Sequence, residues 1–541
     1  MRIARVHIEN YRSIKNLDIC LRNYNVLIGD NNAGKSNILR AVNLVLGELW
    51  PTDRTFTQDD FFGQDTSHDI IIQVYFDEPI DTWRNMSIQV HGFELRGKAY
   101  KRSHRGMPKG TLAADYNCIN AAGETIKYPA EPLQEGKQAR IWYDMKVSRE
   151  LKEHLPFIYI DILRDYHRHE PGYRWSVLRK LLNVVNTELA HDKTQFKVLT
   201  PAGEEKMTRK EAFEYKLREA YNYLQMPDLI EIEARINQNT RDEMGLDQED
   251  ISIHFAPFDP VDVYKNLQMF VDQMGVSTSA ERVGAGMQSA IVTAIFRTYE
   301  ELKKDGAVFA IEGPEIFLHP QKERYLHEVL HSISSNNQVF LTTHSREFMN
   351  IYLPEEVCLI KRNQTEGTQA VICQDQQIAE TVKNELKLID YFDTERNELF
   401  FARGIILVAG ATEKHFISYI GHRLGQDLNR QGISVIDCRG SRSMWLYKKV
   451  AEAFLIPCVS IIPEGSLDEE MVDLIGPEGL FEIAAGNSPE ISWPRETDEL
   501  KSAMEYYNSQ GIETVSATLV KAIKTIIETT NNAGAAREPI C

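Results

Sequence analysis

The sequence predicts an α/β fold in two parts, with a first domain that carries a β arm and a helical insertion and a second, smaller α/β domain. Three observations support this. A glycine-rich turn joins an apolar strand to a helical pattern at 25–46, buried strands end in polar residues at 305–312 and 338–344, and a new strand–turn–helix begins at 404. We expect boundaries at 1–165, 166–250, 251–395 and 396–541.

Composition limits the function classes. The chain has 541 residues, 43% of them hydrophobic, and its net charge of −18 excludes a generally basic nucleic-acid coat. Seven scattered cysteines without a Cys-x-x-Cys pair predict reduced thiols and a cytoplasmic protein. The sequence contains no run of about 18 apolar residues, so it predicts no membrane span. The first residues follow an amphipathic strand pattern rather than that of a signal peptide.

Residues 29–36 read Gly-x-x-x-x-Gly-Lys-Ser, directly after the strand at 25–28 and before the helix at 37–46. In this context the motif is a phosphate loop, whose backbone N–H groups turn inward on a polyphosphate. The lysine neutralises the β/γ-phosphates and the serine hydroxyl ligates Mg²⁺. We therefore predict a nucleoside triphosphate and Mg²⁺ as cofactors, held by Gly29, Asn31, Asn32, Gly34, Lys35, Ser36 and Asn37.

Two later strands end in chemically active side chains. Glu312 closes the strand at 305–312, where a carboxylate can complete the Mg²⁺ shell opposite Ser36, and Glu315 follows. His344 closes the strand at 338–344, which places it in the crevice where open α/β sheets bind ligands. Taken singly, Glu312 or His344 is more often a hydrogen-bonded strand end. Their order behind a phosphate loop predicts one nucleotide site, with Glu315 and His344 as catalytic candidates.

A glycine-rich turn at 281–289, containing Gly284 and Gly286, opens a helical run. Its N–H groups and helix amino end are suited to a γ-phosphate across a dimer interface. From 67 to 160 the pattern is strand-like, which predicts an antiparallel sheet inserted after the phosphate-loop helix. From 175 to about 247 the pattern is mostly helical.

A basic cluster lies at a hairpin of the β arm, beside Tyr100. Exposed Arg and Lys side chains suit phosphate contacts, and the tyrosine can stack on a base. The alternative is a solvated loop that only aids solubility. The predicted nucleic-acid contacts are Arg96, Lys98, Lys101, Arg102 and Arg105.

The second domain has strands at 404–408, 435–437 and 456–462, and Glu413 lies in the helix after the first. More acids follow the last strand at 464 and 468–470. Carboxylates gathered at strand ends can hold Mg²⁺. The acids at 468–470 can equally begin a helix, where negative charge suits the dipole.

These motifs resemble the ATP-binding-cassette ATPases related to SMC heads, and more closely the overcoming-lysogenization-defect (OLD) family, which joins such a head to a Toprim domain. The resemblance lies in the opening 8–15 with Arg12, the run 311–320, the switch segment 343–345 and the turn 284–286. It implies that two heads sandwich ATP, with Gly284 and Gly286 of one copy completing the site of the other and Arg12 contributing to it. It also implies that the helical insertion dimerises and that Glu413 binds Mg²⁺ in the Toprim domain.

Three departures from the family pattern bear on chemistry. Gly313 stands where these heads carry the acid that positions water, and Glu315 is the nearest replacement. In the Toprim domain, Ala409 stands where a glutamate is expected, and 463–465 stands in place of Asp-x-Asp. ATP binding should survive these changes, whereas hydrolysis and DNA cleavage should be weak.

Two functions remain open. The first is an ATP-gated DNA nuclease or effector in prokaryotic antiphage defence, acting as a homodimer or larger homo-oligomer on DNA or another nucleic acid, with a further defence subunit as a candidate partner. The second is a non-catalytic ATP-dependent scaffold or sensor that binds a partner protein or nucleic acid through its Toprim-like domain. The short helical insertion disfavours an SMC-type repair ATPase, and unpaired Cys and His residues disfavour a zinc enzyme.

Overall fold

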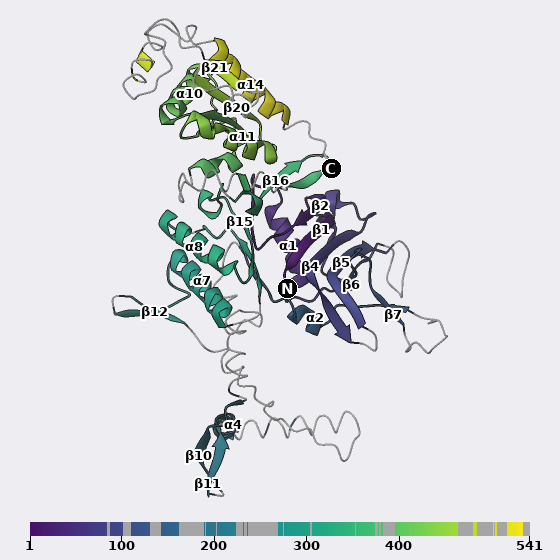
Figure 1. The fold of residues 1–541 in the computed structure, drawn as a ribbon. Coiled ribbons are helices and arrows are strands. Elements are labelled where there is room, and N and C mark those ends of the chain that lie inside the picture. Colours follow the sequence, from purple (N-terminus) through teal and green to yellow (C-terminus); the bar gives the residue numbers. More distant parts are fainter. Residues whose placement is uncertain are drawn as a thin grey trace. The chain divides into compact units, whose positions relative to one another are not determined.

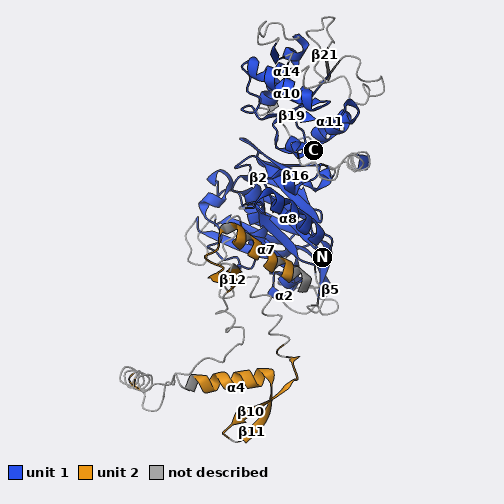
Figure 2. Cartoon of the chain, turned by 90° about the vertical axis from the view of Figure 1, so that its left-hand side faces the viewer, with its two compact units in different colours: residues 1–162, 305–541 blue, residues 163–304 orange. Residues whose placement is uncertain are grey.

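The computed structural model separates the chain into two compact units, residues 1–162 with 305–541 and residues 163–304 (Figure 2). Each is described by itself. The structure describes residues 1–83, 87–100, 110–129, 142–161, 191–201, 203–222, 269–273, 275–302, 306–316, 318–351, 353–373, 395–463, 480–483 and 517–533, with a few single residues between them.

An eleven-stranded sheet forms the amino-terminal part of the first unit, with strands in the order β6-β5-β4-β1-β2-β17-β16-β3-β15-β14-β9 (Figure 1). Strand β3, which leads into the glycine loop, lies between β16 and β15, and all three run parallel. The strands are β1 (Ile3–Tyr11), β2 (Ile14–Cys20), β3 (Tyr24–Gly29), β4 (Ile70–Trp83), β5 (Ser87–Ala99), β6 (Leu112–Ile119), β9 (Phe157–Ile160), β14 (Val308–Glu312), β15 (Gln338–Thr342), β16 (Val357–Asn363) and β17 (Gly367–Ile372).

Helix α1 (Lys35–Leu46) follows the glycine loop and buries Ile38, Leu39, Val42 and Val45. Strands β14 and β15 are buried along their whole length, the pattern of parallel strands covered on both faces. Because β3, β14 and β15 are parallel, their carboxyl ends meet at one edge of the sheet. The smaller elements around this sheet are η1 (Gln58–Asp60), η2 (Phe62–Gln64), β7 (Lys127–Pro129), β8 (Trp142–Asp144), α2 (Arg149–Glu153), α8 (Pro320–Ile333), η4 (Arg346–Phe348) and η5 (Pro354–Glu356).

The antiparallel β arm predicted after the phosphate-loop helix is confirmed, since β4, β5 and β6 follow α1 and pair antiparallel, and the arm is continuous with the large sheet. Strand β4 pairs antiparallel with β1, with Val6 opposite Val74 and Ile8 opposite Ile72. These four side chains are fully buried in one hydrophobic core. Near the end of the strand-like region 67–160, the short strand β8 pairs with β7 outside the large sheet.

The second unit contains a β-hairpin that the helical pattern at 175–247 did not predict. Strands β10 (Gln195–Thr200) and β11 (Gly203–Thr208) pair antiparallel and lead directly into α4 (Arg209–Asn222). Alternating polar and apolar residues along β10 carry the strand signal. A second hairpin, β12 (Phe270–Gln273) with β13 (Val276–Ser279), precedes α7 (Ala285–Leu302).

The carboxyl-terminal part is a four-stranded parallel sheet in the order β19-β18-β20-β21. The three predicted strands are confirmed. Helix α14 adds Ile523 and Ile526 to a core with Ile406 and Phe416. The elements are β18 (Gly404–Val408), α10 (Ala411–Arg423), β19 (Ile433–Asp437), η7 (Ser441–Ser443), α11 (Met444–Ala453), β20 (Cys458–Pro463), β21 (Leu480–Ile483) and α14 (Ala517–Ala533).

A short 3₁₀ helix, η6 (Arg396–Phe401), joins the two sheets of the first unit. The Asn397 side chain donates to the carbonyls of Arg346 and Met349 at 2.9 and 2.8 Å and accepts from the N–H of Ile351. Glu398 pairs with Arg346 at 3.2 Å and accepts from the Ser434 hydroxyl of β19 at 2.8 Å. The segment after β15 is therefore linked through η6 to the carboxyl-terminal sheet.

Helix α8 carries a histidine that makes the head sensitive to acid. The His327 ring stacks on Tyr24 at 5.9 Å and lies 6.0 Å from His331. Burial, together with the neighbouring His331, lowers the pKa of His327 from 6.5 to about 4. Below pH 6.5 the unfolded chain binds a proton that the folded chain does not take up until about pH 4, so stability is lost as pH falls.

Between pH 7.5 and pH 5 the wild type should lose about 2 kcal/mol more unfolding free energy than a His327→Phe variant. Chemical denaturation at the two pH values measures this difference. His68→Phe is the matched control because His68 is largely exposed. Equal losses in wild type and His327→Phe would show that His327 does not resist protonation.

Two further findings bear on the predicted setting. The cysteines that the structure describes, from Cys20 to Cys458, are all free thiols. None of the described helices combines the length and the apolarity needed to cross a membrane.

Candidate nucleotide site and Toprim centre

The glycine loop closes around the lysine ammonium. Gly29 and Gly34 have φ angles of +139° and +110°, which only glycine adopts without strain. Lys35 is buried, and its Nζ donates to the carbonyls of Gly29 at 2.8 Å and Asp30 at 3.0 Å. Burial lowers the pKa of Lys35, and the charges of Asp30 and Glu315 oppose that shift. The loop thus holds a cation at the place that the sequence predicted for phosphate.

Polar side chains from β17, from the turn between β1 and β2 and from α1 support the loop. Thr368 donates to the carbonyl of Ala33 at 2.8 Å, and its Oγ1 lies 2.8 Å from the Ser13 hydroxyl. Asn37 Nδ2 donates to the same Ser13 oxygen at 2.9 Å. A Cβ at Gly34 would lie 2.2 Å from Thr368 Oγ1, so the contact requires glycine. Sequence reasoning missed Ser13 and Thr368.

The remaining predicted loop residues lie around this core. Asn31 and Asn32 are exposed at the loop tip, and Ser36 is half-buried in the first turn of α1. Arg12 has a φ of +51° and donates through Nε to Asp60 Oδ1 at 2.8 Å. Its role as a nucleotide contact stays a prediction.

Glu312 ends β14 and is 1% exposed. Its Oε1 accepts a hydrogen bond of 2.7 Å from the Tyr159 hydroxyl, and Arg40 Nε lies 3.6 Å from the same oxygen. Oε2 accepts no hydrogen bond from the residues that the structure describes. A carboxylate with one uncommitted oxygen, together with the Ser36 hydroxyl, fits the oxygen ligands that Mg²⁺ prefers.

Glu315 and His344 lie together beside Lys35. Glu315 Oε1 accepts from the backbone N–H of His344 at 2.8 Å, and its buried Oε2 has no hydrogen-bond partner among the described residues. Burial and the Lys35 charge lower the pKa of His344, while Glu315 opposes the shift. At neutral pH the imidazole is therefore uncharged and can both donate and accept.

Gly313, between Glu312 and Glu315 in the sequence, has a left-handed backbone conformation. Its φ is +54°, and its N–H donates to the carbonyl of Thr342 at 2.9 Å. Thr342 directly precedes the switch segment, so the turn at Gly313 is fixed to the end of β15. Any other L residue would be strained there by roughly 1–2 kcal/mol.

In the carboxyl-terminal sheet, Ala409 and Gly410 follow β18 and Glu413 lies in the first turn of α10. Glu413 is only 9% exposed, and a Cβ at Gly410 would lie 2.8 Å from its Oε2. A buried cation lies at the neighbouring strand end. Arg396, 5% exposed, donates to the Asp437 carbonyl at 2.6 Å, and its guanidinium lies 3.7 Å from Asp437 Oδ2. Sequence reasoning missed Arg396.

Comparison with known proteins decides the family. The AAA ATPase domain model matches residues 1–349, and the model of the overcoming lysogenization defect protein-like TOPRIM domain matches residues 400–462. The chain belongs to the OLD family. The resemblance inferred from the motifs is thereby confirmed, and so is the fold class: an ATPase head followed by a Toprim domain.

Full-length relatives agree with this assignment. The OLD nuclease of Thermus scotoductus (strain ATCC 700910 / SA-01) is 28% identical over 471 residues, covering 85% of this chain and 82% of that protein. The Old nuclease of Escherichia phage P2 is 23% identical over 482 residues, covering 84% and 75%. Among solved structures, an SMC head bound to the C-winged helix domain of ScpA covers 70% of this chain and is itself fully covered, at 13% identity and a TM-score of 0.40. This OLD-family chain is an enzyme of the ATPase class with a Toprim endonuclease-like domain.

The two glycines predicted to form the signature turn, Gly284 and Gly286, lie in the second unit. Gly284 is exposed just before α7, and its carbonyl accepts from the N–H groups of Met287 and Gln288 at 2.9 and 3.1 Å. Gly286 lies in the first turn of α7. That either glycine completes the site of another copy stays a prediction.

The Toprim metal site also stays a prediction. In the part of the chain that the structure describes, no group of three or more His, Cys, Asp or Glu side chains could hold a metal ion. Pro463 is the last residue of β20. The following residues 464 and 465, and the acids at 468–470, lie outside the described residues.

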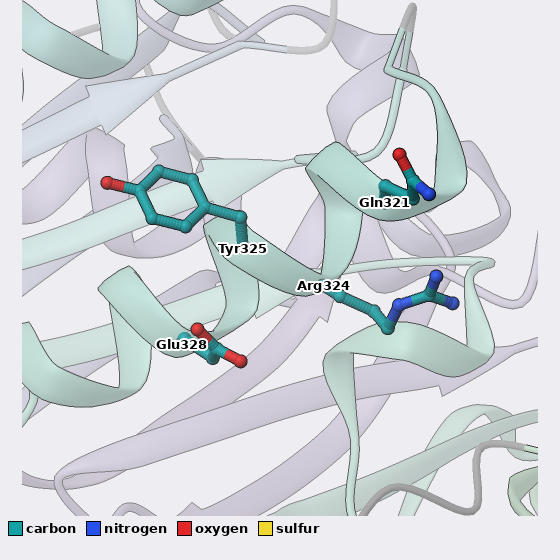
Figure 3. Close-up of a pocket in the computed structure, with 4 residues that line it drawn as sticks. All are labelled: Gln321, Arg324, Tyr325 and Glu328. Carbon is teal, nitrogen blue, oxygen red and sulfur yellow. The ribbon is translucent and has the colours of Figure 1, made fainter.

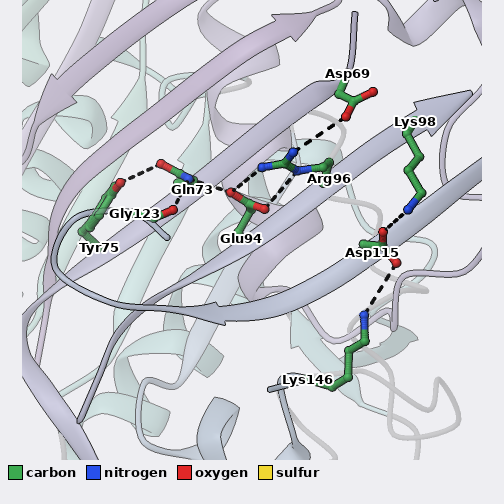
Figure 4. Close-up of polar contacts among 9 residues, drawn as sticks. All are labelled: Asp69, Gln73, Tyr75, Glu94, Arg96, Lys98, Asp115, Gly123 and Lys146. Carbon is green, nitrogen blue, oxygen red and sulfur yellow. Dashed lines mark hydrogen bonds and ion pairs between the residues drawn. The ribbon is translucent and has the colours of Figure 1, made fainter. Parts of the chain in front are cut away.

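The basic cluster of the arm is described only at its base. Arg96 pairs with the buried Glu94 at 3.1 Å and lies 3.8 Å from Asp69 (Figure 4). Lys98 pairs with Asp115 on the neighbouring strand (Figure 4). These carboxylates already neutralise much of the positive charge of Arg96 and Lys98 that a phosphate would otherwise neutralise. Lys101, Arg102 and Arg105 lie outside the described residues, so nucleic-acid contact by this hairpin stays a prediction.

One surface pocket contains none of the predicted site residues. It has a volume of about 370 Å³ and is lined by Gln321, Arg324, Tyr325 and Glu328, all on α8 (Figure 3). Nothing in its chemistry assigns it a ligand.

Proposed function

We propose that this OLD-family protein binds Mg²⁺–ATP in its head and acts as an ATP-gated DNA nuclease or effector of prokaryotic antiphage defence, with reduced hydrolysis and cleavage. The observation that carries the proposal is the cluster of Lys35, Glu315 and His344 at the edge of the parallel strands. It supplies a buried cation, a carboxylate and a neutral imidazole where the γ-phosphate would lie. The names of the relatives, OLD nuclease and Old nuclease, support the nuclease class.

The binding step follows from the loop. Lys35 Nζ has two carbonyl partners, and a triphosphate would replace them with charge-assisted bonds. The amino end of α1 favours the same charge. Ser36 and Glu312 would hold Mg²⁺, which supplies charge neutralisation between the β- and γ-phosphates.

For hydrolysis, Glu315 takes the place of the acid missing at Gly313. The buried Oε2 of Glu315 has no hydrogen-bond partner among the described residues and can accept a hydrogen bond from water. Oε1 is held in place by the hydrogen bond from the His344 N–H. Two heads facing each other would place Gly284 and Gly286 of the second copy on the γ-phosphate. A homodimer or larger homo-oligomer is therefore part of the proposal.

The alternative is an ATP-dependent scaffold or sensor whose Toprim-like domain binds a partner protein or nucleic acid. The Arg396 guanidinium beside Asp437 favours it, because a buried positive charge at a strand end opposes metal binding there. Ala409 in place of a glutamate acts in the same direction.

Plasmid cleavage separates the two functions. Purified protein is incubated with supercoiled DNA and Mg²⁺ or Mn²⁺, with and without ATP, beside Ala409→Glu and its neutral control Ala409→Gln. We expect little cleavage by the wild type and an increase on the order of tenfold in Ala409→Glu alone, since an added carboxylate strengthens metal binding. Robust cleavage by the wild type would show that the loss of acids does not limit the nuclease.

A further inference from the structure

The proposed Mg²⁺ ligand of this head, Glu312, is a glutamate. P-loop NTPases in general hold the metal with an aspartate, and Glu312 has one more methylene and one more rotatable bond. An unrestrained glutamate must lose that freedom each time it binds a cation. The longer side chain therefore needs a partner that fixes it before the metal arrives.

Two residues from distant segments supply such partners. Tyr159 comes from the edge strand β9, next to β14, and donates its hydroxyl to Glu312 Oε1 at 2.7 Å. Arg40, one turn into α1 from Ser36, approaches the same oxygen at 3.6 Å. Both contacts fall on one oxygen, and Oε2 accepts no hydrogen bond from the described residues. The Glu312 carboxylate is thus held through Oε1 alone among the described contacts.

The contacts with Tyr159 and Arg40 favour one fixed orientation of the Glu312 carboxylate. A phenol O–H donates and a carboxylate accepts, so Tyr159 is the donor to Glu312 Oε1. Glu312 is 1% exposed, so water cannot readily replace the phenol. A donor on one oxygen of a metal-binding carboxylate orients the other, as partners behind metal ligands generally do.

We propose that Tyr159, assisted by Arg40, is a positioning residue that presents Glu312 Oε2 to Mg²⁺ in the nucleotide site. The inference rests on the proposed Mg²⁺–ATP site. Tyr159 itself touches neither the nucleotide nor the metal. It acts only through the orientation of Glu312, so its removal should change the Mg²⁺ requirement rather than nucleotide binding without metal.

The test measures the Mg²⁺ concentration that gives half-maximal enhancement of fluorescent ATP-analogue binding, with metal-free affinity in EDTA as a second readout. Tyr159→Phe should raise that concentration roughly tenfold and leave the metal-free affinity within about twofold. Tyr75→Phe is the matched control, because it also removes one buried phenol hydrogen bond, to Gln73 at 2.6 Å, from the same sheet. It should change neither value.

A double-mutant cycle makes the test specific. In a Glu312→Asp background the shorter side chain no longer reaches the Tyr159 hydroxyl, so adding Tyr159→Phe should have no further effect on the Mg²⁺ requirement. An unchanged requirement in Tyr159→Phe, or the same tenfold rise in the aspartate background, would overturn the positioning role. If the wild type binds no nucleotide with or without Mg²⁺, the proposed ATP site itself fails.

Discussion

Replacing Lys35 by alanine should abolish ATP binding, with a loss of affinity of at least about 100-fold. The ammonium lies inside the 29–36 loop, where it donates to the carbonyls of Gly29 and Asp30. Without it, the triphosphate charge would meet those carbonyls uncompensated. Isothermal titration with ATP and Mg²⁺ measures the effect.

Lys15→Ala is the control for this experiment. Lys15 is an exposed lysine of the same domain that pairs with Glu366 at 3.1 Å. Its removal should leave ATP affinity within about twofold, since exposed pairs contribute little. Unchanged affinity in Lys35→Ala would remove the phosphate-loop assignment.

Replacing Glu315 by glutamine should stop ATP hydrolysis while preserving ATP binding. Glutamine keeps the shape of the side chain and can still accept from the His344 N–H, but it cannot take a proton. General-base catalysis typically contributes 10²–10⁴ in rate, so we expect kcat to fall at least roughly 100-fold with little change in KM. Steady-state phosphate release measures both parameters.

Two comparisons sharpen this prediction. Glu366→Gln changes an exposed carboxylate and should leave kcat unchanged. Gly313→Glu restores an acid at the position where the family carries it, although the φ of +54° opposes the substitution. A wild-type protein that binds ATP without any hydrolysis, or a Glu315→Gln variant with normal kcat, would contradict a catalytic role for Glu315.

The parts of the nucleotide site that the sequence predicted are those with linear signals. The glycine loop, Glu312 and His344 each follow an apolar strand, and parallel strands bring their carboxyl ends to one edge. Chain order and strand direction were therefore sufficient to group them. The hydrogen bond from the backbone N–H of His344 to the Glu315 carboxylate was not predictable, because it depends on the turn at Gly313.

The supporting residues carry no such signal. Tyr159 lies in a short apolar strand, and nothing local shows that β9 pairs beside β14 rather than elsewhere. Thr368 and Ser13 meet only because β17 and β2 are neighbours, with Gly367 opposite Ile14. Such partners depend on sheet order, which alternating strand patterns leave open.

The ion pairs of the β arm could be predicted in part from the sequence. Glu94 and Arg96 are two apart on one strand, so they share a face, and their pairing follows from strand geometry alone. The Lys98–Asp115 pair requires the register between β5 and β6, in which Arg96 lies opposite Asp115. Arg96 and Lys98 are therefore paired with carboxylates rather than free, and the rest of the predicted cluster stays a prediction.

The most direct measurement is a structure determined with a non-hydrolysable ATP analogue and Mg²⁺. The account predicts triphosphate density within the 29–36 loop, in contact with Lys35, and a metal between Ser36 and Glu312 Oε2. An empty loop with the analogue bound elsewhere would contradict it.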